Sequence, residues 1–477
     1  MHRLDFSARR SASAVVAALL VSGLALPAAA QDTTGTIRYK AVTLAPIGAA
    51  VGDLIWRSRN LSSDIGSPYQ NIPFDGTTNA KTTEYRGTGR HSRLGLIADA
   101  HSDGDTITAV WEMDFLAAGT TSKSDENNGY PMRMRQAWVN LGMDNGTSLA
   151  AGQMWSLLVT NKKGVNLRSE QVPMTIDAQY AVGYDWARQG ELRWTKNGAT
   201  VSYAASIEGA QTSFSAKNVP SNIVIGQPGG SQLNSLTNYS TDLSPDAIAK
   251  IAFDPQGMGH WELKALGRLL RDRIVDPTNA SGGSRSLTTL GGGVGYGVWF
   301  PVMSNGRDVV DLLSSGLVGK GIGRYGTSQL IDATIDSDGS MKPIKAAHFV
   351  VGIEAHPTRK VDVYSYEGVE YADRTSFRDA SGRGVGYGSP LNVVSGCQVE
   401  GVPSGPFGPT SGTCNADNRA IWQASLGFWY RLKKSAVGTL QWGMEYSRTV
   451  RETWSGVGGE PRGTENMVLS SFRYLLP

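Results

Sequence analysis

Three arginines stand where they could set the charge of a water-filled passage. Arg93 precedes the apolar tract 94–98, and Arg133 and Arg135 alternate with methionines in the segment 131–138. Successive side chains of an extended strand point to opposite faces, so these arginines are expected on the polar face of their strands. Charged side chains on the wall of a pore determine which ions pass. The chemistry that this pattern predicts is electrostatic selection of anions, with no catalytic residue.

Amphipathic strands are the elements that would position these arginines. In residues 420–432 and 437–449, apolar side chains alternate with polar or small ones. Each segment is about as long as the ~10 residues that cross a bilayer as a tilted strand. The same alternation in 93–99 and 131–138 places Leu94, Met134 and Trp138 on the lipid side. The aromatic residues expected to form girdles at the two membrane interfaces are Trp138, Trp194, Trp261, Trp422, Trp442, Tyr446 and Tyr474.

The N-terminus has the pattern of an export signal. Three arginines lie within the first ten residues, an apolar stretch follows over 14–26, and three alanines end at Ala30. This order predicts a secretory signal peptide over 1–30, cleaved between Ala30 and Gln31, and a barrel over 31–477. No later stretch has the ~18 unbroken apolar residues of a membrane helix, so only a closed barrel of strands could span a membrane.

The connections alternate between short turns and long loops. Short, turn-rich connections fall at 101–105, 143–146, 196–199, 254–259, 304–308, 356–359 and 432–435. Longer polar stretches fall at 59–83, 118–130, 159–179, 211–246, 275–286, 320–342, 374–418 and 453–463. Fifteen connections imply sixteen strands, with both termini on the short-turn side. The predicted fold class is therefore all-β, an antiparallel transmembrane barrel with short periplasmic turns and long external loops.

Three segments carry a more specific resemblance. Residues 92–96, 135–139 and 151–156 read Ser-Arg-Leu-Gly-Leu, Arg-Gln-Ala-Trp-Val and Ala-Gly-Gln-Met-Trp-Ser. This series resembles the front half of Gram-negative general porins, and most closely the DcaP-like porins, over residues 84–158. The resemblance implies a homotrimeric diffusion pore in the outer membrane that favours small anions such as dicarboxylates, and it assigns Arg93, Arg133 and Arg135 to the eyelet.

Two features depart from that resemblance, and one loop extends it. The N-terminal coiled-coil extension of DcaP is absent, and the chain ends on Pro477, whereas most such barrels end on an aromatic residue. In general porins the third loop folds into the channel, so the resemblance nominates Lys162, Lys163 and Arg168 of the loop 159–179 as further eyelet residues. A solvated external cluster of charges is the alternative for these three side chains. For the strand arginines, the alternative is an inward ion pair with Asp99, Glu191 or Glu208.

Cys397 and Cys414 are the only cysteines, and both lie in the long segment 374–418. An exported chain meets an oxidising compartment, so we expect one disulfide in an external loop. Such a bond would stabilise the loop by about 3 kcal/mol on the chain-entropy estimate. No third ligand is nearby, so the sequence predicts neither a metal site nor a cofactor.

Composition and motifs limit the other function classes. The formal charge is +3, of which the first 30 residues carry +2, so nucleic acid is not an expected partner. A barrel hydrolase would need a nucleophile signature such as Gly-x-Ser-x-Gly, which does not occur. A TonB-dependent receptor would need more residues than 31–477 for its plug and 22 strands. The open alternative to a diffusion pore is a structural or adhesive barrel whose lumen is blocked by its own loops.

Overall fold

The computed structural model describes residues 36–117, 129–224, 242–276, 283–304, 307–401 and 413–477. The predicted signal peptide, with Ala30 and Gln31, and most of the predicted loop 118–130 lie outside these residues. No helix among the described residues is long and apolar enough to cross a membrane.

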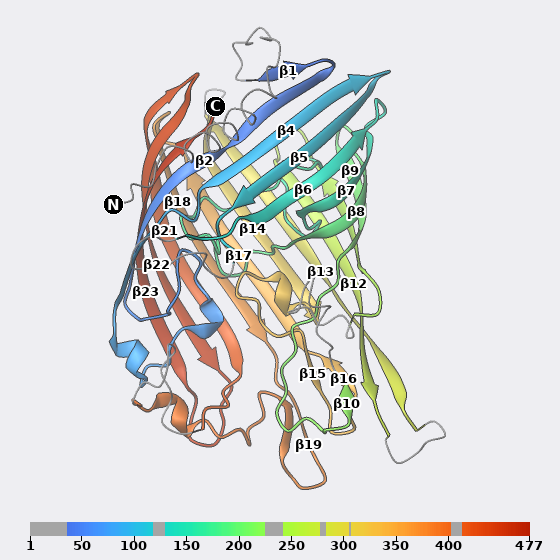
Figure 1. The fold of residues 1–477 in the computed structure, drawn as a ribbon, viewed down its shortest axis with the longest axis vertical. Coiled ribbons are helices and arrows are strands. Elements are labelled where there is room, and N and C mark those ends of the chain that lie inside the picture. The colour runs from blue at the N-terminus through green and yellow to red at the C-terminus, as the bar shows by residue number, and fades with distance from the viewer. Residues whose placement is uncertain (1–35, 118–128, 225–241, 277–282, 305–306, 402–412) are drawn as a thin grey trace, which may run out of the picture.

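Sixteen antiparallel strands form one closed sheet, a barrel whose strands are tilted against its long axis (Figure 1). The first strand of the barrel, β2, pairs with β4 over residues 42–49 and with β23 over residues 49–57. Because β23 is the last strand, this pairing closes the barrel. The strands are β2 (Val42–Arg57), β4 (Arg93–Ser102), β5 (Asp105–Asp114), β6 (Arg133–Gly142), β7 (Thr147–Trp155), β8 (Arg188–Lys196), β9 (Val201–Glu208), β11 (Asp246–Phe253), β12 (His260–Ile274), β13 (Arg285–Ser304), β14 (Arg307–Lys320), β17 (Lys345–Ala355), β18 (Val361–Ala372), β21 (Asn418–Ser435), β22 (Gly438–Thr453) and β23 (Arg462–Leu475). The predicted fold class and strand count are confirmed.

Short elements extend the barrel at its two ends. β3 (Glu84–Thr88) continues the line of β4 along β2, so this barrel strand is interrupted at 89–92. The others are β1 (Ile37–Tyr39), η1 (Tyr69–Asn71), η2 (Thr78–Lys81), β10 (Ile223–Val224), η4 (Gly323–Tyr325), β15 (Ala333–Ile335), β16 (Met341–Pro343), β19 (Thr375–Arg378), β20 (Gly384–Tyr387) and η5 (Ser395–Gln398). The C-terminus and β1 lie at the short-turn end, whereas β15, β16 and β19 lie at the long-loop end (Figure 1).

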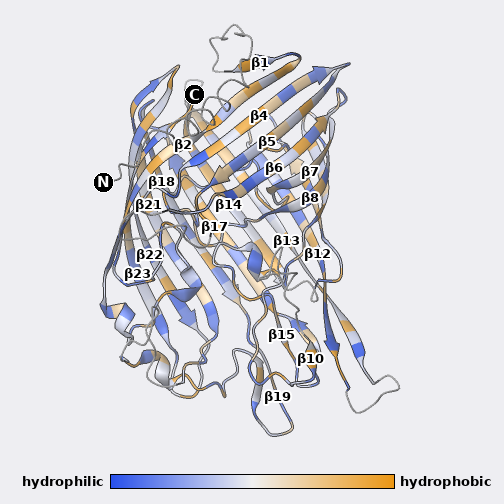
Figure 2. Cartoon of the chain, in the orientation of Figure 1, coloured by the Kyte–Doolittle hydropathy of each residue, from blue (hydrophilic) through white to orange (hydrophobic). Residues whose placement is uncertain are grey.

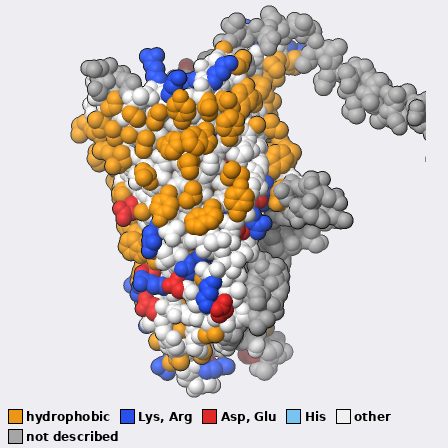
Figure 3. All heavy atoms as spheres, turned by 90° about the vertical axis from the view of Figure 1, so that its left-hand side faces the viewer, with side chains coloured by type: hydrophobic (Ala, Val, Ile, Leu, Met, Phe, Trp, Pro, Cys, Tyr) orange, Lys and Arg blue, Asp and Glu red, His pale blue; other side chains and the backbone are white. Residues whose placement is uncertain are grey.

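The strands alternate in polarity as the sequence predicts (Figure 2). In β12, Trp261 and Leu263 are 42% and 58% exposed, while Glu262 and Lys264 between and beside them are buried. The outward apolar side chains form a broad band on the visible face in Figure 3, and charged residues gather below it toward the long-loop end. Because lipid contacts the outside and water or protein fills the inside, this is the polarity that a membrane barrel requires. All of the predicted girdle aromatics except Trp138 are outward and exposed.

Trp138 corrects the predicted faces of β6. Its side chain is only 5% exposed and packs inside the barrel with Ile97 and Met154. The register between β5 and β6 shifts at Arg135, which is the extra residue of a β-bulge. A bulge reverses the alternation beyond it, so counting by twos from Met134 gives the wrong face for every residue after the bulge.

One predicted turn is also wrong. Residues 432–435 belong to β21, which pairs with β22 as far as Ser435 and Gly438, so the turn consists of residues 436 and 437. The register of this pair shifts between Arg431 and Lys433. The two lysines of the segment look like turn residues in the sequence, but they extend the strand beyond the apolar band.

Candidate pore constriction

The third long loop consists of residues 156–187, between β7 and β8. Its first residues accept hydrogen bonds from two buried lysines of the barrel wall. Lys264 Nζ donates hydrogen bonds to Leu158 O at 2.5 Å and to Thr160 Oγ1 at 2.9 Å. Lys250 Nζ donates to Val159 O at 2.6 Å. Both ammonium groups are fully buried and lie 3.1 Å from Glu262 carboxylate oxygens, which offset the cost of burying their charge. The loop is therefore attached to the inner face of β11 and β12.

The same loop reaches the opposite wall. The backbone of Met174 accepts a hydrogen bond from Trp429 Nε1 at 2.8 Å and donates one to Tyr366 Oη at 2.7 Å. Farther along, Val182 N donates to Gln423 Oε1 at 3.0 Å and Gly183 N to Glu370 Oε1 at 2.9 Å. These partners lie on β18 and β21, so the loop crosses the inside of the barrel and narrows its lumen.

Arg133 and Arg135 of β6 face the lumen beside this loop. Arg133 donates to both carboxylate oxygens of Asp114, at 3.0 and 2.8 Å, and Arg135 Nη1 donates to the same carboxylate at 2.8 Å. Gln153 Nε2 donates to the carbonyls of residues 134 and 135, at 3.0 and 3.1 Å. The side chain of Gln153 thus satisfies the backbone groups that the bulge leaves unpaired.

Arg93 extends the arginine group along β4. Its guanidinium lies 3.6 Å from Glu112, which also lies 3.4 Å from Arg135. On its other side, Arg93 Nη2 is 3.1 Å from His91 Nε2, and His91 Nδ1 is 3.2 Å from Arg473 Nη2. The ion-pair partners are therefore Asp114 and Glu112. The sequence-based alternatives were wrong, since Asp99 accepts from Thr108, Glu191 pairs with Arg193, and Glu208 accepts from Ser206.

Arg188, at the start of β8, is a lumen arginine that the sequence analysis missed. Its guanidinium lies over the rings of Trp155 and Trp186, 4.7 and 5.2 Å from their centroids. Its Nη1 is buried and has no hydrogen-bond partner among the described residues, and no ion pair to Arg188 occurs there. A guanidinium over an aromatic face is attracted by the ring electrons, which hold it in place without neutralising it as a carboxylate would. The available sequence signal was its place directly after the third loop and next to Trp186.

An aromatic layer separates two cavities inside the barrel. Tyr180 and Trp155 line a cavity of about 410 Å³ toward the short-turn end, and Trp186 lines one of about 480 Å³ toward the long-loop end. The ring centroids of Tyr180 and Trp155 are 6.0 Å apart, and those of Trp155 and Trp186 are 6.3 Å apart. Arg93, Arg135 and Arg473 face the first cavity, while Arg133 and Arg188 face the second. The arginines therefore surround the layer from both sides.

The pKa of Tyr180, in the third loop, shows the electrostatic effect of these arginines. Burial by itself would raise the pKa of the phenol, but Arg135, Arg188 and Arg93 outweigh burial and lower its pKa to about 8. Arg135 Nη2 donates to its hydroxyl at 3.4 Å. Among the described residues around the layer, the guanidinium groups of Arg93, Arg133, Arg135, Arg188 and Arg473 face three carboxylates, those of Asp53, Glu112 and Asp114. Arg431 and Asp362 also line the first cavity but pair with each other, so the group as a whole is positive.

The structure places the predicted loop cations apart from this group. Lys163 and Arg168 are exposed, and the backbone between them bonds to short turns: Gly164 N donates to Asp254 at 3.0 Å and Val165 N to Asn197 at 3.1 Å. Lys162 is half-buried, with Nζ 5.7 Å from the centroid of the Trp299 ring. None of the three lines either of the two cavities. The predicted disulfide between Cys397 and Cys414 is present and staples the long loop between β18 and β21.

Comparisons with known proteins support the fold. No family model matches the sequence, and no curated protein matches it. Among solved structures, the outer membrane channel DcaP of Acinetobacter baumannii is similar at a TM-score of 0.62 and 18% identity, over 92% of this chain and 99% of that one. OmpF of Salmonella typhi (TM-score 0.48, 10% identity, 92% and 100% covered) and an anion-selective porin of Comamonas acidovorans (0.47, 11%, 91% and 100%) resemble it more distantly. The chain thus has the barrel fold of outer-membrane porins, as the sequence resemblance implied.

Proposed function

We propose that the protein is a passive channel for small hydrophilic solutes in the Gram-negative outer membrane, with a preference for anions. The fold is shared with an outer membrane channel, and the outward apolar band fits a membrane. The inner cavities are lined by glutamine, serine, threonine and arginine side chains, which suit hydrated polar solutes. Residues 1–30 would direct export, with cleavage between Ala30 and Gln31, and the working form would be a homotrimer.

The observation that carries this proposal is the excess of guanidinium groups around the aromatic layer, with Arg188 outside any ion pair among the described residues. A fixed charge in a narrow space with low-dielectric walls is screened less than one on an open surface. The positive lumen would concentrate anions such as small dicarboxylates, and the absence of tight binding would let them leave.

Planar-bilayer recording tests the proposal against a blocked barrel. The mature chain, shown to be folded by faster gel migration before boiling than after, should give stepwise conductance increases in KCl. Light scattering in detergent should give the mass of three chains for the conducting species. A folded, inserted barrel that gives no conductance steps would instead support the structural barrel with a blocked lumen.

A further inference from the structure

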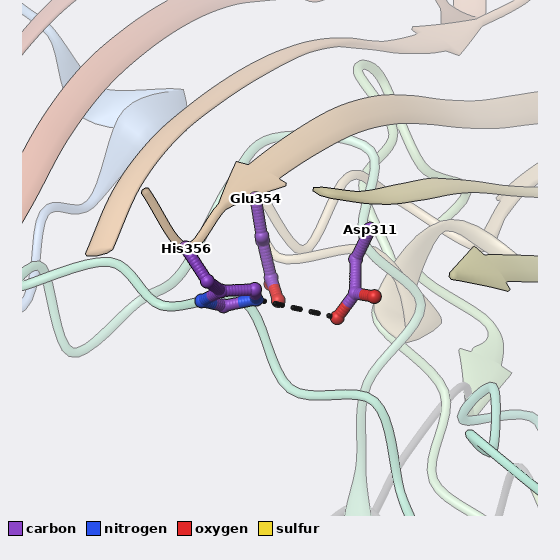
Figure 4. Close-up of side chains that lie close together, drawn as sticks. All are labelled: Asp311, Glu354 and His356. Carbon is purple, nitrogen blue, oxygen red and sulfur yellow. Dashed lines mark ion pairs between the residues drawn. The ribbon is translucent and has the colours of Figure 1, made fainter. Parts of the chain in front are cut away.

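Three potential metal ligands converge at the short-turn end of the barrel, outside the constriction. Asp311 near the start of β14 pairs in register with Glu354 near the end of β17, and His356 follows directly. One ligand atom from each of the three side chains lies within 4.8 Å of the others. Figure 4 shows the His356 ring and the two carboxylates pointing toward a common point. Asp311 and Glu354 are almost completely buried, while His356 is 24% exposed at its side chain.

Neighbouring side chains form hydrogen bonds to His356 and Glu354, as is typical around metal ligands. Nδ1 of His356 lies 2.8 Å from Asp362 Oδ1, a carboxylate oxygen that can only accept, so Nδ1 carries a proton and Nε2 faces Asp311. Histidines that bind metals almost always donate their other ring nitrogen in this way. Glu354 Oε1 accepts hydrogen bonds from Tyr366 at 2.7 Å and from Gln171 at 3.0 Å, which fix the carboxylate. Asp362 itself pairs with Arg431.

The distance between His356 and Asp311 suits two ligands of one small cation. His356 Nε2 and Asp311 Oδ2 are 3.6 Å apart, too long for a good hydrogen bond. Two ligand atoms each about 2.1 Å from a tetrahedral ion are roughly 3.4 Å apart.

We propose that Asp311, Glu354 and His356 bind one divalent transition-metal cation, such as Zn²⁺, at the short-turn mouth of the barrel. Imidazole together with carboxylates suits Zn²⁺ better than Ca²⁺ or Mg²⁺, which prefer oxygen ligands alone. The ion would tie β14 to the end of β17. It would also add positive charge beside Asp362 and Arg431, which line the cavity of about 410 Å³.

Metal titration of the folded, untagged protein tests the site without reference to channel activity. After treatment with EDTA, calorimetric titration with Zn²⁺ should show one tight site per chain, and Ca²⁺ should bind far more weakly. His356→Gln, Glu354→Gln and Asp311→Asn should each weaken Zn²⁺ binding at least about tenfold, and Asp362→Asn about tenfold or more. His101→Gln is the matched control, because this histidine is exposed at the end of β4, where its Nδ1 lies 3.0 Å from Thr106 Oγ1 and far from the three proposed ligands in sequence.

Gel migration before and after boiling shows which variants fold. Because three ligand variants are made, the test still works if one of them does not fold. Two results would overturn the proposal. In the first, the wild-type protein takes up no stoichiometric Zn²⁺, which would mean that a protonated His356 simply pairs with the carboxylates. In the second, folded ligand variants bind Zn²⁺ as tightly as the His101→Gln control.

Discussion

The arginines of the lumen differ in what their removal would leave behind. Arg135 is 3% exposed at its side chain and bonds the fully buried Asp114, so Arg135→Ala would leave a buried carboxylate with less compensation. Breaking a buried ion pair from one side costs about 3–5 kcal/mol. Arg188 stacks on tryptophans, so its charge can be removed with less damage.

Arg188→Gln should therefore reduce anion preference and leave the barrel folded. A charge about 6 Å from a passing ion is worth about 0.7 kcal/mol even in water, or about a threefold change in local ion concentration. We expect the anion-to-cation permeability ratio, from the reversal potential in a salt gradient, to fall about threefold or more. Arg383→Gln is the control, because its side chain is 63% exposed in the loop after β19. Equal effects of the two substitutions would mean that the lumen field is not the source of selectivity.

Tyr180 adds a pH dependence to the same site. The positive surroundings lower the pKa of its phenol to about 8, so the tyrosine is neutral below that pH and becomes negative above it. Anion preference should be complete below about pH 7 and should decrease as the pH rises through about 8. Reversal potentials should be compared up to about pH 9.5, below the usual lysine pKa of about 10.4. The control is Tyr180→Phe, which should remove the step, and a step that persists in this variant would assign it to another group.

At the scale of residues, sequence alone placed Arg93, Arg133 and Arg135 on the inner face of the barrel but did not find their ion-pair partners. Alternation shows which face a side chain occupies, and the inward position of these arginines follows from it. Their partners depend on register between strands, and Arg188 depends on the path of the third loop. Neither property is encoded in a single strand, so the carboxylates and Arg188 required the structure.

At the scale of elements, the third loop and the bulge in β6 define the constriction. The bulge turns Arg135 and Gln136 to the same cavity, and Gln153 stabilises it from β7. Such a bulge leaves no clear mark in the sequence, which is why Trp138 was assigned to the lipid face. Long strands with unbroken alternation, such as β12 and β21, were predictable because nothing interrupts their register.

The two buried lysines should control how firmly the third loop is held. Lys264→Met removes the donor to Leu158 O and Thr160 Oγ1, and an unsatisfied buried polar group costs about 1–3 kcal/mol. We expect larger current fluctuations in single channels and a lower unfolding temperature, because the buried Glu262 also loses one of its two lysine partners. Lys196→Met is the control, since this lysine bonds Asn145 O at the short-turn end. If the current through Lys264→Met channels fluctuates no more than in the wild type, the contacts of the third loop with β18 and β21 are sufficient to hold it.

At the scale of the whole molecule, the barrel combines an outer apolar band with a group of arginines around its constriction. The chain carries 45 basic and 42 acidic residues, so its net charge says little about selectivity. What matters is the placement of five arginines around one aromatic layer, with three carboxylates beside them. The strand count was predictable because turns and loops differ strongly in length. The crossing loop became visible only with its contacts on both walls.

The reversal potential of the wild-type channel tests this account most directly. With mature protein in a planar bilayer and a KCl gradient across it at about pH 7, below the titration of Tyr180, the sign of the zero-current voltage shows which ion passes more easily. The positive constriction predicts that chloride passes more easily than potassium, by about threefold or more from a single uncompensated charge. A zero-current voltage of the opposite sign, or none, in channels that conduct would contradict it.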